Sequence, residues 1–543
     1  MTNIDIQTSL NESIKCYNAG QMQQAKELCH KILEVDPENA TGLYLLGTIY
    51  GNTNNNEKAQ ELISKVIQII PEFPDAYLKL AIIFQEQGNL SAAIENYHKA
   101  ISLKPENHQA IYNLGVALQE QGNIQEAIKS YYKAITLKPE NHQAFYNLGI
   151  SLQEQGDFRE AIENYKKAIA IKPDYHQALY NLGNALKEHG DLQKAIENYK
   201  KTIAIKPNYH QAFYNLGIVL QEQGKLSEAI EHYHKAISVK PDYYQAYNNL
   251  GIAIKDQGNR SEAIKNYKKA ISIKPDYCEA FYNLGNILKE QGNLSEAIYH
   301  FQKAIDLKPD YCEALNNLGN ALKEQGNLSE AIEQFQKVID LKPDYCEALN
   351  NLGNALKEQG NHQAAIENYR KALSLKPDYH QAVYNLGNFL QNNNYIKDVI
   401  HLFRNKQLPK LKDLLKINNA LLLPPIYNNK QDLLHWRKRL HKNVQKGIND
   451  NWKIPHSMLN SVLGTFYLVY QGYNNIKINA CIARMLSLST PNTVIETEQK
   501  KTKKNLQIYD QNKTCRKIKI GFISTHFRQH SVTDFYKNLI INI

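Results

Sequence analysis

Residues 312–345 read CEALNNLGNALKEQGNLSEAIEQFQKVIDLKPDY, and near-copies of this stretch occupy the chain on both sides of it. The period is 34 residues, and it is clearest in the prolines that close the copies. These are Pro37, Pro71, Pro105, Pro139, Pro173, Pro207, Pro241, Pro275, Pro309, Pro343 and Pro377. A fixed period of this size is typical of structural units that stack, because one unit alone cannot bury its apolar side.

Each copy has the pattern of two amphipathic helices, because apolar residues recur at helical spacing in both halves of it. Gly326 suits the left-handed residue that ends the first helix. Asn327, with Glu330 three residues later, predicts the N-terminal cap of the second helix. Pro343 stops that helix, and we expect Asp344 to cap the first helix of the next copy.

The order of Leu-Gly, alanine, an aromatic residue, alanine and proline at these offsets resembles the tetratricopeptide repeat. The resemblance covers residues 6–413; the first two copies, 6–39 and 40–73, diverge as end units do, and the last copy is degenerate. It implies an all-α fold, an α-solenoid of about 11–12 helix pairs that wind into a right-handed superhelix with a concave groove.

The net charge of +10 over 543 residues hides a split. From Arg404 onward there are 24 Lys and Arg residues and 7 Asp and Glu residues, so this part is basic. Before Arg404 there are 40 Lys and Arg residues and 47 Asp and Glu residues, so the repeat array is mildly acidic. The N-terminus has no basic leader followed by an apolar core, and no stretch reaches the ~18 apolar residues of a membrane span. We therefore expect a cytoplasmic protein that makes no membrane contact.

The cysteines and histidines do not form a metal-binding pattern. Cys278, Cys312 and Cys346 recur at one position of successive copies, which predicts small half-buried residues instead of a disulfide or metal ligands. Histidines at the start of the copies also stand 34 residues or more apart, too far for a compact ligand set. They are His108, His142, His176, His210 and His380. We predict no metal site.

Asparagine precedes the Leu-Gly pair in nine successive copies. The nine are Asn113, Asn147, Asn181, Asn215, Asn249, Asn283, Asn317, Asn351 and Asn385. Asparagine is a mediocre helix former, so its recurrence inside a helix needs a reason. A carboxamide donates and accepts hydrogen bonds, which suits it to hold the backbone of an extended peptide whatever its side chains are. Alternatively, each asparagine bonds a neighbouring copy, or the row only records duplication.

The repeat arm of O-linked N-acetylglucosamine (O-GlcNAc) transferases is similar, and it carries such an asparagine ladder along its inner surface, where it holds substrate polypeptide. This resemblance favours the first hypothesis, with extended segments of other proteins as partners. Neighbouring residues would then adjust the groove: Gln109, Gln143, Gln177, Gln211, Glu279, Glu313 and Glu347. The recurring second-helix aromatics, such as Tyr131 and Phe335, are expected to be packing residues.

The repeat pattern fails after Asn388. We expect residues 414–489 to be a helical region that precedes a catalytic domain, 490–515 to be a polar lysine-rich linker and 516–543 to begin an α/β domain. Leu433, Trp436 and Leu440, among basic residues, predict a basic amphipathic helix. Such a helix can bind a membrane or nucleic acid, or it can simply pack on the next domain with its charges solvated.

Three further stretches resemble the O-GlcNAc transferase and SPINDLY family, glycosyltransferase family 41: PPIY (424–427), FYLVYQG (466–472) and KIKIGFISTHFRQHSVTDF (517–535). The resemblance implies a two-lobed GT-B domain, whose first strand would be residues 517–524, and transfer of a sugar from a donor such as UDP-GlcNAc to protein Ser or Thr. It places His530 at the active site, a residue suited to proton handling. The chain departs from the family at His526.

Only 19 residues follow Ser524, too few for the two domains between which a nucleotide sugar binds. We therefore expect this chain alone not to transfer sugar and to hold no cofactor. It is then the protein-recognition arm of an O-GlcNAc-transferase-like enzyme or a stand-alone scaffold for protein partners. The acidic array argues against a third hypothesis, nucleic-acid binding through the basic tail. A homo-oligomer of this chain is a further hypothesis that the sequence does not decide.

Overall fold

The computed structural model describes residues 6–393, 395, 398, 399, 412–423, 430–450, 452, 453 and 482. In this part of the chain all regular structure is helical, with 25 helices. This confirms the all-α prediction. The strand expected at residues 517–524 and the regions 490–515 and 516–543 lie outside the described residues.

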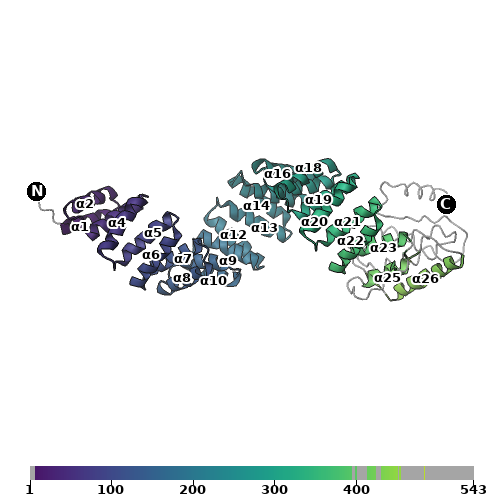
Figure 1. The fold of residues 1–543 in the computed structure, drawn as a ribbon, viewed down its shortest axis with the longest axis horizontal. Coiled ribbons are helices and arrows are strands. Elements are labelled where there is room, and N and C mark those ends of the chain that lie inside the picture. Colours follow the sequence, from purple (N-terminus) through teal and green to yellow (C-terminus); the bar gives the residue numbers. More distant parts are fainter. Residues whose placement is uncertain are drawn as a thin grey trace. The chain divides into compact units, whose positions relative to one another are not determined.

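Eleven pairs of helices follow one another along the chain (Figure 1). The first helices are α1 (Ile6–Asn18), α3 (Ala40–Asn52), α5 (Pro74–Glu86), α7 (His108–Glu120), α9 (His142–Glu154), α11 (His176–Glu188), α13 (His210–Glu222), α15 (Tyr244–Asp256), α17 (Cys278–Glu290), α19 (Cys312–Gln325) and α21 (Cys346–Gln359). The second helices are α2 (Met22–Val35), α4 (Asn56–Ile69), α6 (Leu90–Leu103), α8 (Ile124–Leu137), α10 (Phe158–Ile171), α12 (Leu192–Ile205), α14 (Leu226–Val239), α16 (Arg260–Ile273), α18 (Leu294–Leu307), α20 (Leu328–Leu341) and α22 (His362–Leu375). The pairs keep the 34-residue period that the sequence predicts.

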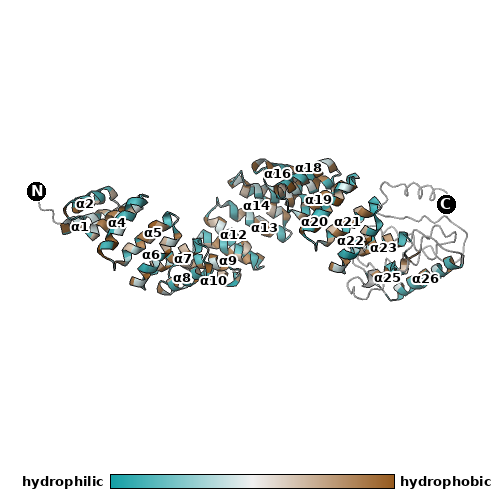
Figure 2. Cartoon of the chain, viewed as in Figure 1, coloured by the Kyte–Doolittle hydropathy of each residue, from teal (hydrophilic) through white to brown (hydrophobic). Residues whose placement is uncertain are grey.

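The chain divides into two compact units, Met1–Lys337 and Val338–Ile543. The first unit holds α1 to α19, and the second holds α21, α22, α23 (His380–Asn392), α25 (Lys412–Leu421) and α26 (Lys430–Asn449). Within each unit the helices alternate hydrophilic and hydrophobic residues along their length (Figure 2). The handedness of the superhelix stays a prediction.

An aromatic ring of the second helix packs directly against a glycine of the first helix. A Cβ atom added to Gly149 would lie 2.6 Å from Cε1 of Tyr165. A Cβ atom added to Gly319 would lie 2.6 Å from Cε1 of Phe335. These rings are fully buried, which confirms them as packing residues. In the first helix pair, Ser13 stands at the position of this glycine and Cys29 at the position of the ring. The smaller Cys29 side chain leaves room for the larger Ser13.

The helix ends follow the sequence prediction in part. Gly326 ends α19 with φ 95°, a left-handed conformation that favours glycine, as expected. Asp344 does not cap α21: the N-cap is Tyr345, and it makes no side-chain capping bond. Asp344 precedes that position by one residue, so the prediction of this cap was wrong.

The last two described helices belong with the end of the array. Nε2 of Gln391, which is buried at the end of α23, donates to the backbone oxygen of Leu423 after α25 (2.8 Å). Asn419 of α25 stands 34 residues after Asn385 of α23, which is one repeat period, although it lies nearer the end of its helix than Asn385 does. Among the helices of the described residues, none combines the length and the apolar character needed to cross a membrane.

Candidate functional site

The nine predicted asparagines all lie at the same place in a first helix, two turns before its end. They fall on α7, α9, α11, α13, α15, α17 and α19 in the first unit and on α21 and α23 in the second. Each is half-buried. We call these nine residues the asparagine ladder and the side of the first helices that they occupy the ladder face.

Ladder asparagines donate hydrogen bonds from Nδ2 to the residue 35 positions earlier, on the first helix of the preceding repeat. The acceptor is a tyrosine hydroxyl for Asn147 (3.0 Å), Asn181 (3.1 Å), Asn215 (2.9 Å), Asn249 (3.0 Å) and Asn317 (3.2 Å). It is an asparagine Oδ1 for Asn283 (3.0 Å) and Asn385 (2.9 Å). The hypothesis that each ladder residue bonds a neighbouring repeat is therefore correct for these seven.

We call the residues that directly precede the ladder asparagines the acceptor row. They are Tyr112, Tyr146, Tyr180, Tyr214, Asn248, Tyr282, Asn316, Asn350 and Tyr384. The sequence shows the mixture of tyrosine and asparagine but gives no reason for it. The reason is now visible, because both residue types place an oxygen acceptor before the ladder asparagine of the next repeat.

A second hydroxyl lies close to the same amide nitrogen. Burial raises the pKa of Tyr131 above its usual range, and a hydrogen bond from Asn147 to its hydroxyl opposes that rise. The Tyr131 ring lies 6.0 Å from the Tyr112 ring, and its hydroxyl donates to Oε1 of Gln119 (2.8 Å). The nitrogen side of the carboxamide is thus turned toward the preceding repeat.

The oxygen side of the carboxamide is available at most of the ladder. Within the described residues no side chain or backbone group bonds Oδ1 at six positions: Asn147, Asn181, Asn215, Asn283, Asn317 and Asn385. At the first position, Oδ1 of Asn113 accepts from Nε2 of Gln109 (2.9 Å). The ladder therefore presents a periodic series of acceptors on otherwise satisfied side chains.

Asn184 and Asn286, on first helices, also accept from the ladder residues Asn215 (2.9 Å) and Asn317 (2.8 Å). A set of asparagines on the second helices behaves differently. On the second helices, Nδ2 of Asn96, Asn164, Asn198, Asn266 and Asn368 donates to the backbone oxygen four residues earlier in the same helix, at 2.8–2.9 Å. These side chains serve their own helix. The ladder asparagines instead link neighbouring repeats, and at six positions their Oδ1 atom has no bond within the described residues.

The rings of the acceptor row are held by aromatic neighbours. Tyr146 lies 4.9 Å from Tyr175 and 6.0 Å from Tyr165, measured between ring centroids. Burial raises the pKa of Tyr146, and it raises that of Tyr214 to about 12, although the hydrogen bond from the ladder asparagine opposes the rise in both. These hydroxyls therefore stay protonated near neutral pH.

The residues expected to adjust the groove line the start of the same helices. Gln109, Gln143, Gln177 and the three glutamates Glu279, Glu313 and Glu347 are exposed, whereas Gln211 is half-buried. Ion pairs near the other end of the helices, such as Lys289 with Glu324 (3.4 Å), join neighbouring repeats.

The histidine and cysteine rows take part in packing. The ring of His142 lies 5.3 Å from that of Tyr175, edge to face, and burial lowers the pKa of His142. Cys278, Cys312 and Cys346 are half-buried and form no disulfide within the described residues. In the described part of the chain no group of His, Cys, Asp and Glu residues could hold a metal ion. His530 lies outside the described residues.

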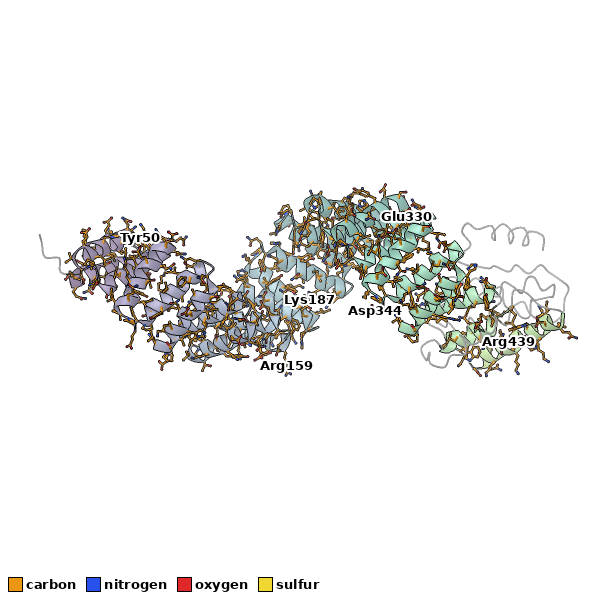
Figure 3. All side chains as sticks on the ribbon, in the orientation of Figure 1. Tyr50, Arg159, Lys187, Glu330, Asp344 and Arg439 are labelled. Carbon is orange, nitrogen blue, oxygen red and sulfur yellow. The ribbon has the colours of Figure 1, made fainter. Side chains whose placement is uncertain are left out.

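The basic amphipathic helix, α26, packs on α25. Its packing on a following domain stays a prediction. The guanidinium of Arg439 donates to the backbone oxygens of Leu422 (3.1 Å) and Asn419 (2.8 Å) and lies 4.8 Å from the Trp436 ring (Figure 3). It also donates to Oδ1 of Asn419 (2.8 Å). This bond places an N–H donor on the carboxamide oxygen of an asparagine that follows Asn385 by one repeat period.

Comparison with known proteins gives a family. A model described as TPR repeat matches eight successive segments that together span residues 83–360, and two models described as tetratricopeptide repeat match 17–83 and 346–379. None of the curated proteins compared with the chain matches it.

Several solved structures match parts of the chain. MamA is 33% identical over 30% of this chain and 95% of its own, with a TM-score of 0.29. YrrB, described as a TPR protein with an unusual peptide-binding site, is 26% identical over 34% and 96%, with a TM-score of 0.31. Pseudomonas aeruginosa PilF is 19% identical over 38% and 94%, with a TM-score of 0.35. Because the repeat models cover more than half of the residues, the chain belongs to the tetratricopeptide repeat family.

Proposed function

We propose that the ladder face captures extended segments of other proteins by their backbone. The observation that carries this proposal is the series of unengaged Oδ1 atoms at six of the nine ladder positions, on carboxamides whose nitrogen is already bonded. An extended peptide has backbone N–H groups at regular intervals along its length, and amide oxygens accept from them. The bond from Arg439 to Asn419 is the intramolecular counterpart of such a contact.

This chemistry makes recognition nearly independent of peptide sequence. Backbone N–H groups are common to all residues except proline, so the ladder supplies affinity without selecting side chains. Selection then falls to the exposed residues at the helix starts, which are neutral at Gln109, Gln143 and Gln177 and acidic at Glu279 and Glu313. Protein–protein interaction is the role that the repeats support.

A finer proposal rests on the sequence motifs at 424–427, 466–472 and 517–535. In an O-GlcNAc-transferase-like enzyme the ladder face would deliver Ser or Thr hydroxyls to a site that uses a nucleotide sugar such as UDP-GlcNAc, with His530 beside the reacting groups. A stand-alone scaffold would use the same ladder without catalysis. The intact mass of the protein isolated from its source distinguishes the two: a mass well above 62.3 kDa supports the first, and a mass of 62.3 kDa supports the second.

The test of peptide capture compares two triple variants of the full chain. Asn147→Ala, Asn181→Ala and Asn215→Ala remove three ladder carboxamides, and Asn164→Ala, Asn198→Ala and Asn266→Ala remove three that bond only their own helix. The probe is a fluorescein-labelled peptide of Ser, Thr and Ala, and the readout is fluorescence anisotropy.

We expect the ladder variant to lose at least about tenfold in affinity, because three hydrogen bonds of about 0.5–1.5 kcal/mol each are removed. The control variant should bind as the parent does, because alanine is an excellent helix residue and the ladder is untouched. Equal affinity of both variants and the parent would overturn the proposal.

A further inference from the structure

We infer that the acceptor row is a set of positioning residues that orient the ladder carboxamides for peptide capture. The inference rests on the proposed function and adds to it the residues that make the ladder competent. Its premise is the pattern of bonds from each ladder Nδ2 to the acceptor of the preceding repeat.

A ladder carboxamide needs such a partner because its last torsion is soft. The χ2 angle of asparagine is broadly distributed, so an unheld amide presents oxygen and nitrogen in turn. The second-helix asparagines show the alternative state, in which Nδ2 turns back to the carbonyl four residues earlier. The bond across to the preceding repeat draws the ladder nitrogen away from its own helix and leaves Oδ1 on the opposite side of the amide plane.

The composition of the acceptor row agrees with this role. Six positions are tyrosine and three are asparagine, and these two side chains differ in size and ring character but share an oxygen acceptor. Asn248 and Asn350, both buried, accept from Asn283 and Asn385 just as Tyr112 accepts from Asn147. Packing alone would not make tyrosine and asparagine equivalent.

The acceptor oxygens are themselves held in place. The Tyr180 ring lies 5.1 Å from Tyr209 and 6.0 Å from Tyr199, in the same arrangement as Tyr146 with Tyr175 and Tyr165. At Tyr146 and Tyr180 two ring contacts hold the position of the hydroxyl, and the hydroxyl in turn orients the ladder amide that it accepts from. The capture surface is thus organised before a peptide arrives.

The test uses Tyr112→Phe and Tyr146→Phe together in the full chain, which keeps the rings and removes the acceptors of Asn147 and Asn181. Tyr180 is left in place, because Asn215 also donates to Oδ1 of Asn184 (2.9 Å). The probes are the labelled Ser, Thr and Ala peptide and the same peptide with alternate backbone nitrogens methylated. In the parent, methylation should weaken binding strongly because it removes the N–H donors.

We expect the Phe variant to bind the unmodified peptide about fivefold less tightly, since two ladder amides lose their fixed orientation. We also expect the methylation penalty to shrink in this variant, a coupling that a purely structural role of the hydroxyls would not produce. An unchanged affinity or an unchanged methylation penalty overturns the inference.

A single-site comparison supplies a second readout. Tyr146→Asn restores an acceptor that the chain itself uses at Asn248, so it should bind more tightly than Tyr146→Phe although it loses the ring; the reverse order overturns the inference. If the ladder Asn→Ala variant loses binding while the Phe variant does not, peptide capture stands and only positioning fails. If the ladder variant binds as the parent does, capture itself fails.

Discussion

An asparagine inside a helix can satisfy its carboxamide in two ways, and this chain uses both. Asn164 folds back on its own helix, whereas Asn147 reaches across to Tyr112 of the preceding repeat. The sequence shows asparagine at both places and cannot distinguish them, because the difference depends on an acceptor 35 residues away. The regular spacing predicted the position of the ladder, but the direction of each amide comes from the packing of two repeats.

The buried hydroxyl of Ser151 provides a test of packing at one residue. Its Oγ is buried without a hydrogen-bond partner among the described residues, and neighbouring repeats have alanine here, at Ala117 and Ala185. Ser151→Ala should therefore raise the stability of the array by about 1 kcal/mol, because the cost of an unsatisfied buried group disappears. Thermal unfolding followed by circular dichroism measures the change. Ser130→Ala, at an exposed serine bonded to its own helix, is the control and should change little.

Gly149 should tolerate no larger residue without cost. Its added Cβ would meet the Tyr165 ring at 2.6 Å, so Gly149→Ala forces the ring to move. We expect the free energy of unfolding to fall by about 1 kcal/mol, which is the lower end of the range for overpacking. The effect should be small because the chain already accepts Ala81 at the equivalent position opposite Tyr97. A melting temperature equal to that of the parent would show that this contact does not limit packing.

At the scale of the helix, asparagines at the N-cap position of a first helix and of a second helix differ in whether their side chain caps. Asn141 caps α9 by accepting from the backbone N–H of Ala144 (3.1 Å), whereas Asn123 at the start of α8 makes no side-chain capping bond and donates to Gln121 instead. Asn141→Ala should lower the stability of its helix by about 1 kcal/mol, whereas Asn123→Ala should lower it by only about 0.3 kcal/mol. Hydrogen exchange in the first turns of α9 and α8 measures both; faster exchange in α8 alone would contradict the assignment.

The helices were largely predictable because their signals are local. Apolar spacing, Gly326 and the 34-residue prolines fix where helices begin and end, within the limits shown by Asp344 and Tyr345. The place of α25 at the end of the array was not predictable, because the glycine, alanine and proline signals are gone there and only Asn419 keeps the repeat period. The role of Arg439 depends on backbone oxygens of another helix, which a sequence does not reveal.

At the scale of the whole molecule, the many buried tyrosines predict a stability that falls at high pH. Burial raises the pKa of Tyr175 and Tyr214 to about 12 and that of core tyrosines such as Tyr165 and Tyr199 above its usual range. Above about pH 10 the unfolded chain loses tyrosine protons that the folded chain keeps, so rising pH favours unfolding. For a fully buried tyrosine, each unit by which the folded pKa exceeds the unfolded pKa contributes about 1.4 kcal/mol to the free energy of unfolding. This contribution is lost progressively as the pH rises from the unfolded pKa to the folded pKa.

The measurement is the melting temperature between about pH 8 and pH 11.5, followed by circular dichroism together with the near-ultraviolet absorbance of tyrosinate. We expect the melting temperature to be steady below about pH 10 and to fall steeply above it, with tyrosinate appearing as helix is lost. Full tyrosine ionisation at pH 10 in a helical protein would contradict the pKa directions.

Backbone capture by the ladder is tested most directly by peptide N-methylation with the unmodified full chain. Anisotropy titrations would compare a labelled Ser, Thr and Ala peptide, two scrambled versions of it and one version methylated at alternate backbone nitrogens. If the ladder oxygens accept from peptide N–H groups, the three unmethylated peptides bind with similar affinity and the methylated one binds at least about tenfold more weakly. Methylated and unmethylated peptides of equal affinity would contradict the role given to the asparagine ladder.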